Sequence, residues 1–183
     1  MKFTPLLLNG AYIVEPTVHG DERGLFYRFY CADEFKQIGH YKPWVQLNQS
    51  YTKSRGTIRG MHFQQPPHAE IKMVKCIKGK IMDIMVDLRN ESQTFLQWVG
   101  IELSAENRRM LYIPEGFAHG FQTLTDDCEL VYHHSAAYAK DSEGGIRWSD
   151  SLVNVHWPLP PINISDRDQQ HPLLTNQFTG IKL

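Results

Sequence analysis

Short runs in which hydrophobic and polar residues alternate follow one another along most of the chain. Alternation with a period of two is typical of β-strands that bury one face. The runs predict strands at residues 12–16, 25–30, 45–48, 57–64, 72–78, 80–87, 98–103, 110–114, 120–124 and 129–133, with the fifth and sixth joined through Gly79. Only residues 32–38 have the pattern of a helix, which is expected to end at Gly39.

The regular spacing of these runs indicates the class of fold. Glycine, aspartate and proline separate the runs, and no long helical stretch alternates with them. This series predicts an all-β antiparallel sandwich or jelly-roll barrel with a few short peripheral helices, rather than a βαβ fold. Residues 19–24 are expected to form a polar loop. The segment 138–183, rich in Pro, Asp and Ser, is expected to wrap the barrel.

Length and composition narrow the classes of function. The 183 residues suffice for a single domain spanning 1–183. With 19 basic and 20 acidic side chains, the charge favours neither nucleic acid nor an anionic membrane as a partner. Three cysteines, odd in number and far apart, fit reduced thiols in a cytoplasmic protein. No apolar run is long enough to span a bilayer, and the opening one is too short for a signal peptide.

Residues 59–64 read Arg-Gly-Met-His-Phe-Gln and place an arginine and a histidine three residues apart on a strand. His62 and Gln64 would point to one side of the sheet and Arg59 to the other. A bulge at Gly60 would bring Arg59 to the rim of the same cavity. A lone buried histidine is more often structural than catalytic, so the hexapeptide alone leaves both roles open.

A Pro-x-Gly-x-x-His motif at residues 114–119 resembles the second half of the signature of the cupins, which are double-sheet jelly rolls. In cupins the first half usually carries His-x-His and a later glutamate, which bind a metal. Here Gln64 stands at the second histidine, and an amide oxygen is a poor ligand for Zn²⁺ or Fe²⁺. A metal site of His62, Glu70 and His119 remains an alternative, as does a structural role for His119.

A lysine and two tyrosines complete the candidate chemistry. Lys72 opens an apolar strand, where it either reaches the surface or supplies a positive charge inside the cavity. Tyr132 lies on a strand and Tyr138 just beyond it, positions at which tyrosines usually pack. Around one pocket, a histidine base, a cation and a phenol are the groups that proton abstraction α to a carbonyl requires.

Seven motifs, in the same order as in the family, make the chain similar to the dTDP-4-dehydrorhamnose 3,5-epimerases. They are Asp21-Glu-Arg-Gly24, Gln46-Leu-Asn-Gln-Ser50, Ile58-Arg-Gly-Met-His-Phe-Gln64, Lys72-Met-Val, Val86-Asp-Leu-Arg89, Ile113-Pro-Glu-Gly-Phe-Ala-His-Gly-Phe121 and Ile164-Ser-Asp-Arg-Asp168. The resemblance implies a cupin-type double-stranded β-helix with no metal and no organic cofactor. It also implies a nucleotide-sugar substrate and a homodimer that exchanges N-terminal strands from about residues 1–30.

The resemblance assigns roles to individual residues. His62, polarised by Asp168, would remove the C5 and C3 protons of a 4-keto sugar, Lys72 would stabilise the enolate at O4, and Tyr132 would return a proton from the other face. Asp168 is preferred to Asp166 because it keeps the family's register with the following Pro-Leu-Leu. The implied binding positions are Gln46, Asn48, Arg59 and His119 for sugar and pyrophosphate, Arg23 and Phe26 for the nucleotide from the partner subunit, and Tyr138 beside the site.

Arg28 departs from the family pattern, which commonly has a glutamate facing the base at this position. A carboxylate accepts from N3–H of thymine, whereas a guanidinium only donates and suits an acceptor such as N3 of cytosine. The expected product is dTDP-4-dehydro-L-rhamnose, for deoxysugar or polysaccharide synthesis. The alternatives are a C3-only or C5-only epimerase acting on another nucleotide sugar such as a CDP-sugar, a metal-dependent cupin enzyme, and a sugar-nucleotide-binding cupin without activity.

Overall fold

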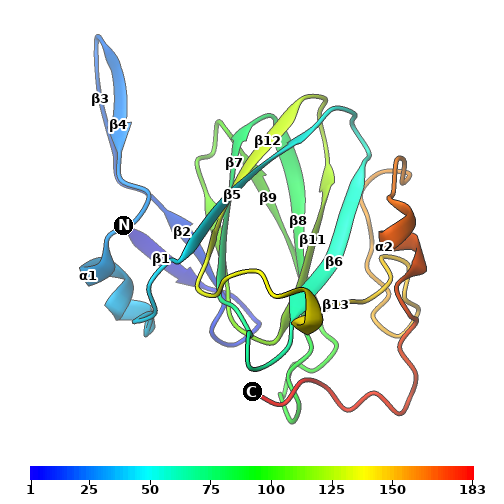
Figure 1. The fold of residues 1–183 in the computed structure, drawn as a ribbon. Coiled ribbons are helices and arrows are strands. Elements are labelled where there is room, and N and C mark those ends of the chain that lie inside the picture. Colours follow the sequence, from blue (N-terminus) through cyan, green and yellow to red (C-terminus); the bar gives the residue numbers. More distant parts are fainter.

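Two antiparallel β-sheets lie face to face and form a barrel, seen in a computed structural model that describes all 183 residues (Figure 1). The strands are β1 (Lys2–Pro5), β2 (Tyr12–Glu15), β3 (Val18–Asp21), β4 (Gly24–Tyr27), β5 (Gln46–Thr52), β6 (Ile58–Gln64), β7 (Lys72–Lys78), β8 (Lys80–Asp87), β9 (Trp98–Ser104), β10 (Met110–Ile113), β11 (Phe117–Thr123), β12 (Cys128–His134) and β13 (Glu143–Gly145). One sheet has the order β1-β2-β10-β7-β12-β5 and the other β13-β6-β11-β8-β9. The predicted all-β jelly roll is confirmed.

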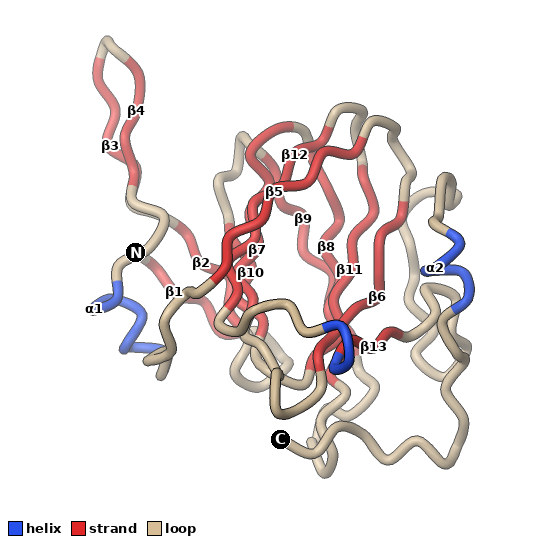
Figure 2. The backbone as a smooth tube through the Cα atoms, in the orientation of Figure 1, coloured by secondary structure: helices blue, strands red, loops and turns tan.

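Helices are few, short and peripheral (Figure 2). They are α1 (Ala32–Phe35), α2 (Asp166–Gln170) and two 3₁₀ turns, Lys36–Ile38 and Lys140–Ser142. The predicted helical stretch 32–38 is therefore half α-helix and half 3₁₀ turn, and it ends as expected at Gly39 with φ +74°. No helix is both long and apolar enough to cross a bilayer.

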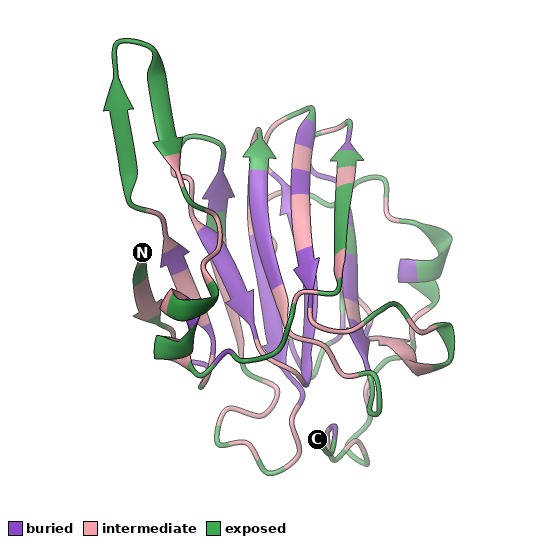
Figure 3. Ribbon diagram, turned by 60° about the vertical axis from the view of Figure 1, so that its left-hand side comes forward, coloured by how far each residue is buried: buried purple, intermediate pink, exposed green.

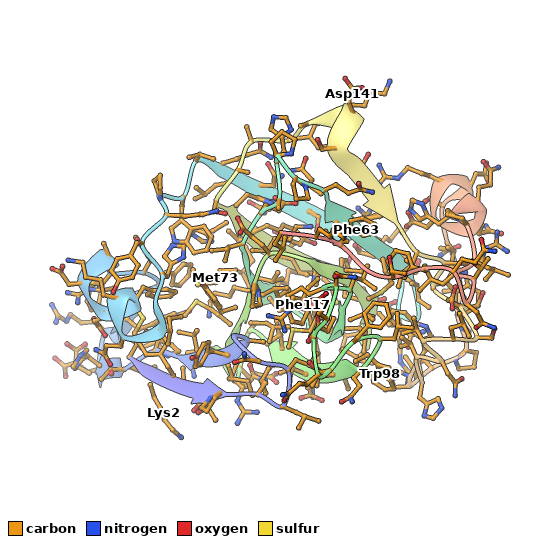
Figure 4. All side chains as sticks on the ribbon, turned by 90° about the horizontal axis from the view of Figure 1, so that it is seen from below. Lys2, Phe63, Met73, Trp98, Phe117 and Asp141 are labelled. Atoms are coloured by element: carbon orange, nitrogen blue, oxygen red, sulfur yellow. The ribbon has the colours of Figure 1, made fainter.

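Strand β8 shows how alternation sorts side chains between two layers. Ile81 and Met85 belong to the core between the sheets, where Phe117 also lies near the middle of the molecule (Figure 4). Ile84 and Val86 point the other way and pack under the C-terminal segment, whose Ile146, Val153 and Ile181 complete this second core. In this structure, these residues of the C-terminal third pack on the outer face of the sheet that contains β8.

The opposite sheet is covered by the N-terminal helix. Phe35 of α1 is fully buried against Val14, Met73 and Met110, which come from three neighbouring strands. Burial of a phenylalanine side chain contributes on the order of 2 kcal/mol to folding. Helix α1 and its 3₁₀ turn stay short but are held by this contact rather than by helix propensity.

Strands β3 and β4 form a two-stranded hairpin that projects from the barrel (Figure 1). Its residues are almost all exposed (Figure 3), including Val18, Leu25 and Phe26, the last with 72% of its surface exposed. A loop was predicted at residues 19–24, but β3 extends to Asp21 and only Glu22 and Arg23 form the turn, so most of that prediction is wrong. The strand predicted at 25–30 corresponds to β4, which ends at Tyr27. Strand β3 gave no signal because neither face of the hairpin is buried within the chain, and strand alternation appears only where one face is buried.

Besides β13 and the second 3₁₀ turn, two further elements have no counterpart among the predicted ones. β1 is a four-residue edge strand that ends at Pro5, and proline is tolerated at such an edge. α2 begins after Ser165, whose Oγ accepts a hydrogen bond from the backbone N–H of Asp168 at 3.1 Å. Its five residues are too few to produce a helical periodicity in the sequence.

Candidate active site

An open cavity of about 600 Å³ lies between the two sheets, a size typical of small-molecule sites. Its lining residues come from both sheets and from the segment after β12. The predicted site residues among them are Gln46, Asn48, Arg59, His62, Lys72, His119, Tyr132 and Tyr138. Eight of the twelve residues proposed from the sequence are thus brought together in one chain.

A β-bulge in β6 explains how Arg59 and His62 reach the same cavity. His62 pairs with His119 and Arg59 with Phe121, so two residues of β6 lie opposite the single Gly120 of β11. Gly60 has φ +122°, and a Cβ there would stand 2.6 Å from Cα of Gly120, so only glycine fits. The regular alternation that set Arg59 on the opposite face is wrong, and the bulge expected at Gly60 is the reason.

His62 and Asp168 form a hydrogen-bonded dyad at the cavity wall. Nε2 of His62 lies 2.7 Å from Oδ1 of Asp168, and the backbone N–H of Gly60 donates to Oδ2 at 3.0 Å. Burial alone would raise the pKa of Asp168, but the hydrogen bonds from His62 and Gly60 outweigh it and lower the pKa to about 2. The carboxylate is therefore ionised at neutral pH and orients the imidazole, leaving Nδ1 as the candidate base.

Asp168→Asn is expected to destabilise the fold by about 2 kcal/mol at pH 7, since a fall in pKa from 3.8 to about 2 stabilises the folded state by roughly that amount. Because the pKa of Asp168 is lowered in the folded state, its carboxylate stabilises the fold fully at pH values above the pKa of the unfolded state. This contribution is lost as the pH falls toward about 2. Urea unfolding should show that the difference in free energy of unfolding between wild type and Asp168→Asn is smaller at pH 3 than at pH 7. Asp141→Asn is the control, because Asp141 is exposed. An equal loss of stability at both pH values in Asp168→Asn would contradict the expectation.

Lys72 is held inside the cavity by a buried carboxylate, so its alternative surface position is excluded. Its Nζ lies 3.1 Å from Oε1 of Glu70, and the two side chains are only 11% and 7% exposed. The other oxygen of Glu70 lies 2.6 Å from Nδ1 of His134. Burial would raise the pKa of Glu70, but the hydrogen bond of His134 and the charge of Lys72 lower it overall.

His119 pairs with a fully buried aspartate. Its Nε2 lies 2.6 Å from Oδ1 of Asp83, and burial raises the pKa of this carboxyl despite the histidine. The second oxygen, Oδ2, has no hydrogen-bond partner. The pair fixes the imidazole so that it faces the cavity, and the structural role considered for His119 and a binding role are thereby compatible.

Tyr132 stands on the sheet that faces His62. His62 lies on β6 and Tyr132 on β12, strands of different sheets, so the two side chains reach the cavity from opposing walls. The phenol is within 2.9 Å of Oγ of Ser50. Burial raises the pKa of Tyr132, which keeps the phenol protonated at neutral pH. A protonated hydroxyl opposite a base is suited to return a proton to the other face of a planar intermediate.

Polar residues line the rim of the cavity. Nη2 of Arg59 donates to the carbonyl of Tyr51 at 3.1 Å, and its guanidinium is otherwise open to solvent. Tyr138 is 56% exposed and donates its hydroxyl to Glu143 at 3.0 Å. These groups are available for a large polar substrate that enters from the open side.

Three proposed residues do not reach the cavity of their own chain. Arg23 and Phe26 lie in the projecting hairpin, and Arg28 follows it. Nη1 of Arg28 donates to Oε1 of Glu34 at 2.9 Å, on helix α1. In a single chain, this guanidinium is therefore engaged by a carboxylate rather than free to read a base.

The residues do not support the alternative metal site of His62, Glu70 and His119, because each of them is committed to a different partner. A different set converges: donor atoms of His62, Asp168 and His171 lie within 4.8 Å of one another. However, Nη2 of Arg167 stands 2.9 Å from Nε2 of His62. A guanidinium beside the same nitrogen opposes a bound cation electrostatically, so the set fits a proton-transfer dyad better than a metal centre.

Several residues of the site were not identified from the sequence. Asp83 sits in β8 between Ile81 and Met85, and a carboxylate among inward-facing apolar residues was the available signal. Glu70 was considered only as a metal ligand, although it anchors Lys72. His134 had no signal, since the residue that it contacts lies 64 positions away.

Comparison with known proteins identifies the family of the chain. The family model described as dTDP-4-dehydrorhamnose 3,5-epimerase matches residues 5–176. The dTDP-4-dehydrorhamnose 3,5-epimerase of Shigella flexneri is 46% identical over 157 residues, which cover 85% of this chain and 86% of the relative. The crystal structure of the enzyme of that name from Elizabethkingia anophelis superposes with a TM-score of 0.92 at 39% identity, covering 97% and 98% of the two chains.

A second solved structure shows what such a protein binds. The dTDP-4-dehydrorhamnose 3,5-epimerase of Bacillus anthracis, solved with TDP and PPi bound, gives a TM-score of 0.91 at 40% identity, with 94% of this chain and 99% of that chain covered. The match by the family model over most of the chain, together with relatives of this identity and coverage, establishes the family. The chain therefore belongs to the dTDP-4-dehydrorhamnose 3,5-epimerase family of isomerases.

Proposed function

We propose that this protein inverts C3 and C5 of dTDP-4-dehydro-6-deoxy-D-glucose to give dTDP-4-dehydro-L-rhamnose. The observation that carries the proposal is the placement of the His62–Asp168 dyad and Tyr132 on opposing walls, with Lys72 in the same cavity. Inversion of a carbon requires a proton to leave from one face and another to arrive at the opposite face. Two walls bearing a base and an acid meet this requirement.

Each step uses a group in the cavity. Nδ1 of His62 takes the proton from the carbon α to the C4 carbonyl while Nε2–H donates to Asp168. The ammonium of Lys72 stabilises the negative charge that develops on O4 of the enolate. Tyr132 then donates its proton to the opposite face of that carbon. Since both carbons flank the carbonyl, the same groups serve C3 and C5 in turn, after His62 has released its proton to solvent and Tyr132 has regained one from solvent.

The projecting hairpin supports a homodimer in which each subunit completes the other's site. Phe26 and Leu25 expose apolar surface on a two-stranded element, which is an unfavourable arrangement for an isolated chain. Arg23 adds a cation on the same hairpin, where its exposed guanidinium pairs with Asp21, and a guanidinium is suited to a diphosphate. A partner subunit would bury the apolar side chains and bring them to the nucleotide end of its cavity.

The three unpaired cysteines fit a reducing compartment, the cytoplasm.

A heterodimer test distinguishes shared sites from self-contained ones. One chain carries His62→Ala and the other carries Arg23→Ala with Phe26→Ala, and two different tags allow only the mixed dimer to be purified. With shared sites, one of the two sites in this dimer is intact, and turnover should reach about half that of wild type while both homodimers stay nearly inactive. A mixed dimer as inactive as its parents would show that each chain builds its own site.

The nucleotide is tested by direct comparison of substrates. Purified enzyme is incubated with dTDP- and CDP-linked 4-keto-6-deoxyglucose, and the product stereochemistry is read from proton–proton couplings by NMR. Because Arg28 is paired with Glu34, we expect the dTDP sugar to be converted to the doubly inverted product and to be preferred. Inversion at C3 alone would support the C3-only alternative, and turnover of only the CDP sugar would assign the base contact to Arg28.

A further inference from the structure

A continuous chain of hydrogen bonds connects the rim of the cavity to Lys72. Its links are Tyr138 N to Gln46 Oε1 (3.0 Å), Gln46 Nε2 to Asn48 Oδ1 (3.3 Å), Asn48 Nδ2 to His134 Nε2 (3.3 Å), His134 Nδ1 to Glu70 Oε2 (2.6 Å) and Lys72 Nζ to Glu70 Oε1 (3.1 Å). The members come from β5, β7, β12 and the segments next to them. All of the side chains line the cavity.

The backbone at one end fixes the direction of every link. The N–H of Tyr138 can only donate, so the oxygen of Gln46 must face it and the amide nitrogen must face Asn48. Asn48 then accepts with its oxygen and presents its own nitrogen to Nε2 of His134. Nε2 has to accept, so His134 is neutral with its proton on Nδ1, from where it donates to Glu70.

Glu70 ends the chain by accepting from both sides. A carboxylate has no donor, so it is compatible with the Nδ1–H of His134 and with the ammonium of Lys72 together. Both Glu70 and Lys72 are largely buried, and a buried carboxylate that loses one of its partners is costly. The position of the Lys72 ammonium is thereby connected with the orientation of the amides of Gln46 and Asn48.

We propose that His134 and Glu70 are positioning residues that orient Gln46 and Asn48 for the sugar and anchor Lys72 for the enolate. This inference rests on the proposed function for its consequences in catalysis. Protonation of His134 at Nε2 places a donor against the donor of Asn48. Any amide flip that relieves this contact moves the conflict to Gln46 or to the N–H of Tyr138. Substrate binding should therefore weaken as His134 becomes protonated.

Several charged and titratable groups face the cavity around His134. They are Glu70 and Lys72 beside β7, Tyr132 on its own strand, Arg59 and His62 on β6, His119 on β11 and Glu143 on β13. Only Glu70 contacts the imidazole as a charged group, while the ring of Tyr132 stacks on it with centroids 6.2 Å apart. Acidification of the medium should thus act on KM through the contact between His134 and Asn48.

Two substitutions at His134 separate the effect of its hydrogen bond to Asn48 from the effect of its hydrogen bond to Glu70. In His134→Asn, the short amide keeps a donor near Glu70 but cannot reach Asn48, so KM should rise about tenfold, lose its increase at low pH and leave kcat within about threefold. His134→Ala removes both contacts, so kcat should also fall, by about tenfold. His156→Ala is the control, since His156 is exposed and lies outside the cavity.

The tautomer of His134 gives a readout that does not depend on turnover. Nitrogen–proton correlation NMR of the wild-type protein, with the His134 signals identified by their absence in His134→Asn, should show a protonated Nδ1 and a bare Nε2 at pH 8. A protonated Nε2, or wild-type KM and kcat for His134→Ala between pH 6 and pH 9, would overturn the proposal. If wild-type protein converts no nucleotide sugar, the proposed function fails, whereas the tautomer still decides whether the chain of hydrogen bonds exists.

Discussion

Replacement of His62 by alanine is expected to lower kcat by about 10³- to 10⁴-fold, which is the upper range for loss of a general base. The imidazole is held by Asp168 at 2.7 Å and reaches the cavity through the bulge at Gly60, so no neighbouring group can take its position. The ring centroid of His171 lies 5.5 Å from that of His62, but this ring packs on Gly145 and does not line the cavity. Initial rates with dTDP-4-keto-6-deoxyglucose measure the effect.

Binding should survive this substitution, because the residues proposed to contact the nucleotide lie in the hairpin of β3 and β4 rather than at His62. Calorimetric titration with dTDP is expected to give a Kd within about threefold of that of wild type, as for a residue acting only in the chemical step. His68→Ala is a matched control, since His68 is exposed and its side chain hydrogen-bonds only to Ser142. A His62→Ala enzyme with more than a tenth of wild-type kcat would require another base.

Replacement of Tyr132 by phenylalanine should lower the rate of inversion by about 10²- to 10³-fold while proton abstraction continues. The substitution removes only the hydroxyl that contacts Ser50, so the ring and its packing remain. His62 can still form the enolate, and once the proton on its imidazole has exchanged with solvent, it returns a deuteron to the same face. In D₂O, substrate recovered from this variant should carry deuterium with its original configuration.

Tyr112→Phe provides the comparison for this result. Tyr112 is also buried, and its hydroxyl contacts His40 rather than any group of the cavity. It should leave both exchange and inversion unchanged, apart from a modest loss of stability of about 1 kcal/mol for the hydrogen bond. Loss of exchange together with inversion in Tyr132→Phe would mean that the tyrosine acts before the enolate forms.

Local patterns explain which parts of the fold were predictable. The two strands joined through Gly79 were predicted because alternation continues on both sides of a glycine, and Gly79 adopts φ +77° in the turn. The placement of Arg59 depended on one extra residue in β6, which the glycine signalled but did not prove. Strand β3 was missed because neither face of the hairpin is buried in the single chain, whereas the predicted strand 25–30 overlaps β4.

The candidate site was predictable in its residue types but not in the contacts between them. The residue types for proton abstraction were visible in the sequence, yet their partners were not, because those partners depend on the packing of distant strands. Asp83 and His119 are 36 residues apart, and Glu70 and His134 are 64 residues apart. Such pairs leave no period in the sequence, so only the folded barrel shows that Lys72 is anchored and that His119 is fixed. The roles of these residues in catalysis stay predictions.

The central claim is that one cavity, with His62 and Tyr132 on opposing walls, inverts both C3 and C5. The deuterium content of the product tests this claim most directly. Wild-type enzyme is incubated with dTDP-4-keto-6-deoxyglucose in D₂O, and the product is read by mass spectrometry and proton NMR. The proposed mechanism predicts that solvent deuterium enters at both C3 and C5, each with inverted configuration. Deuterium at one carbon only would restrict the enzyme to a single inversion, and a product without deuterium would contradict an enolate mechanism.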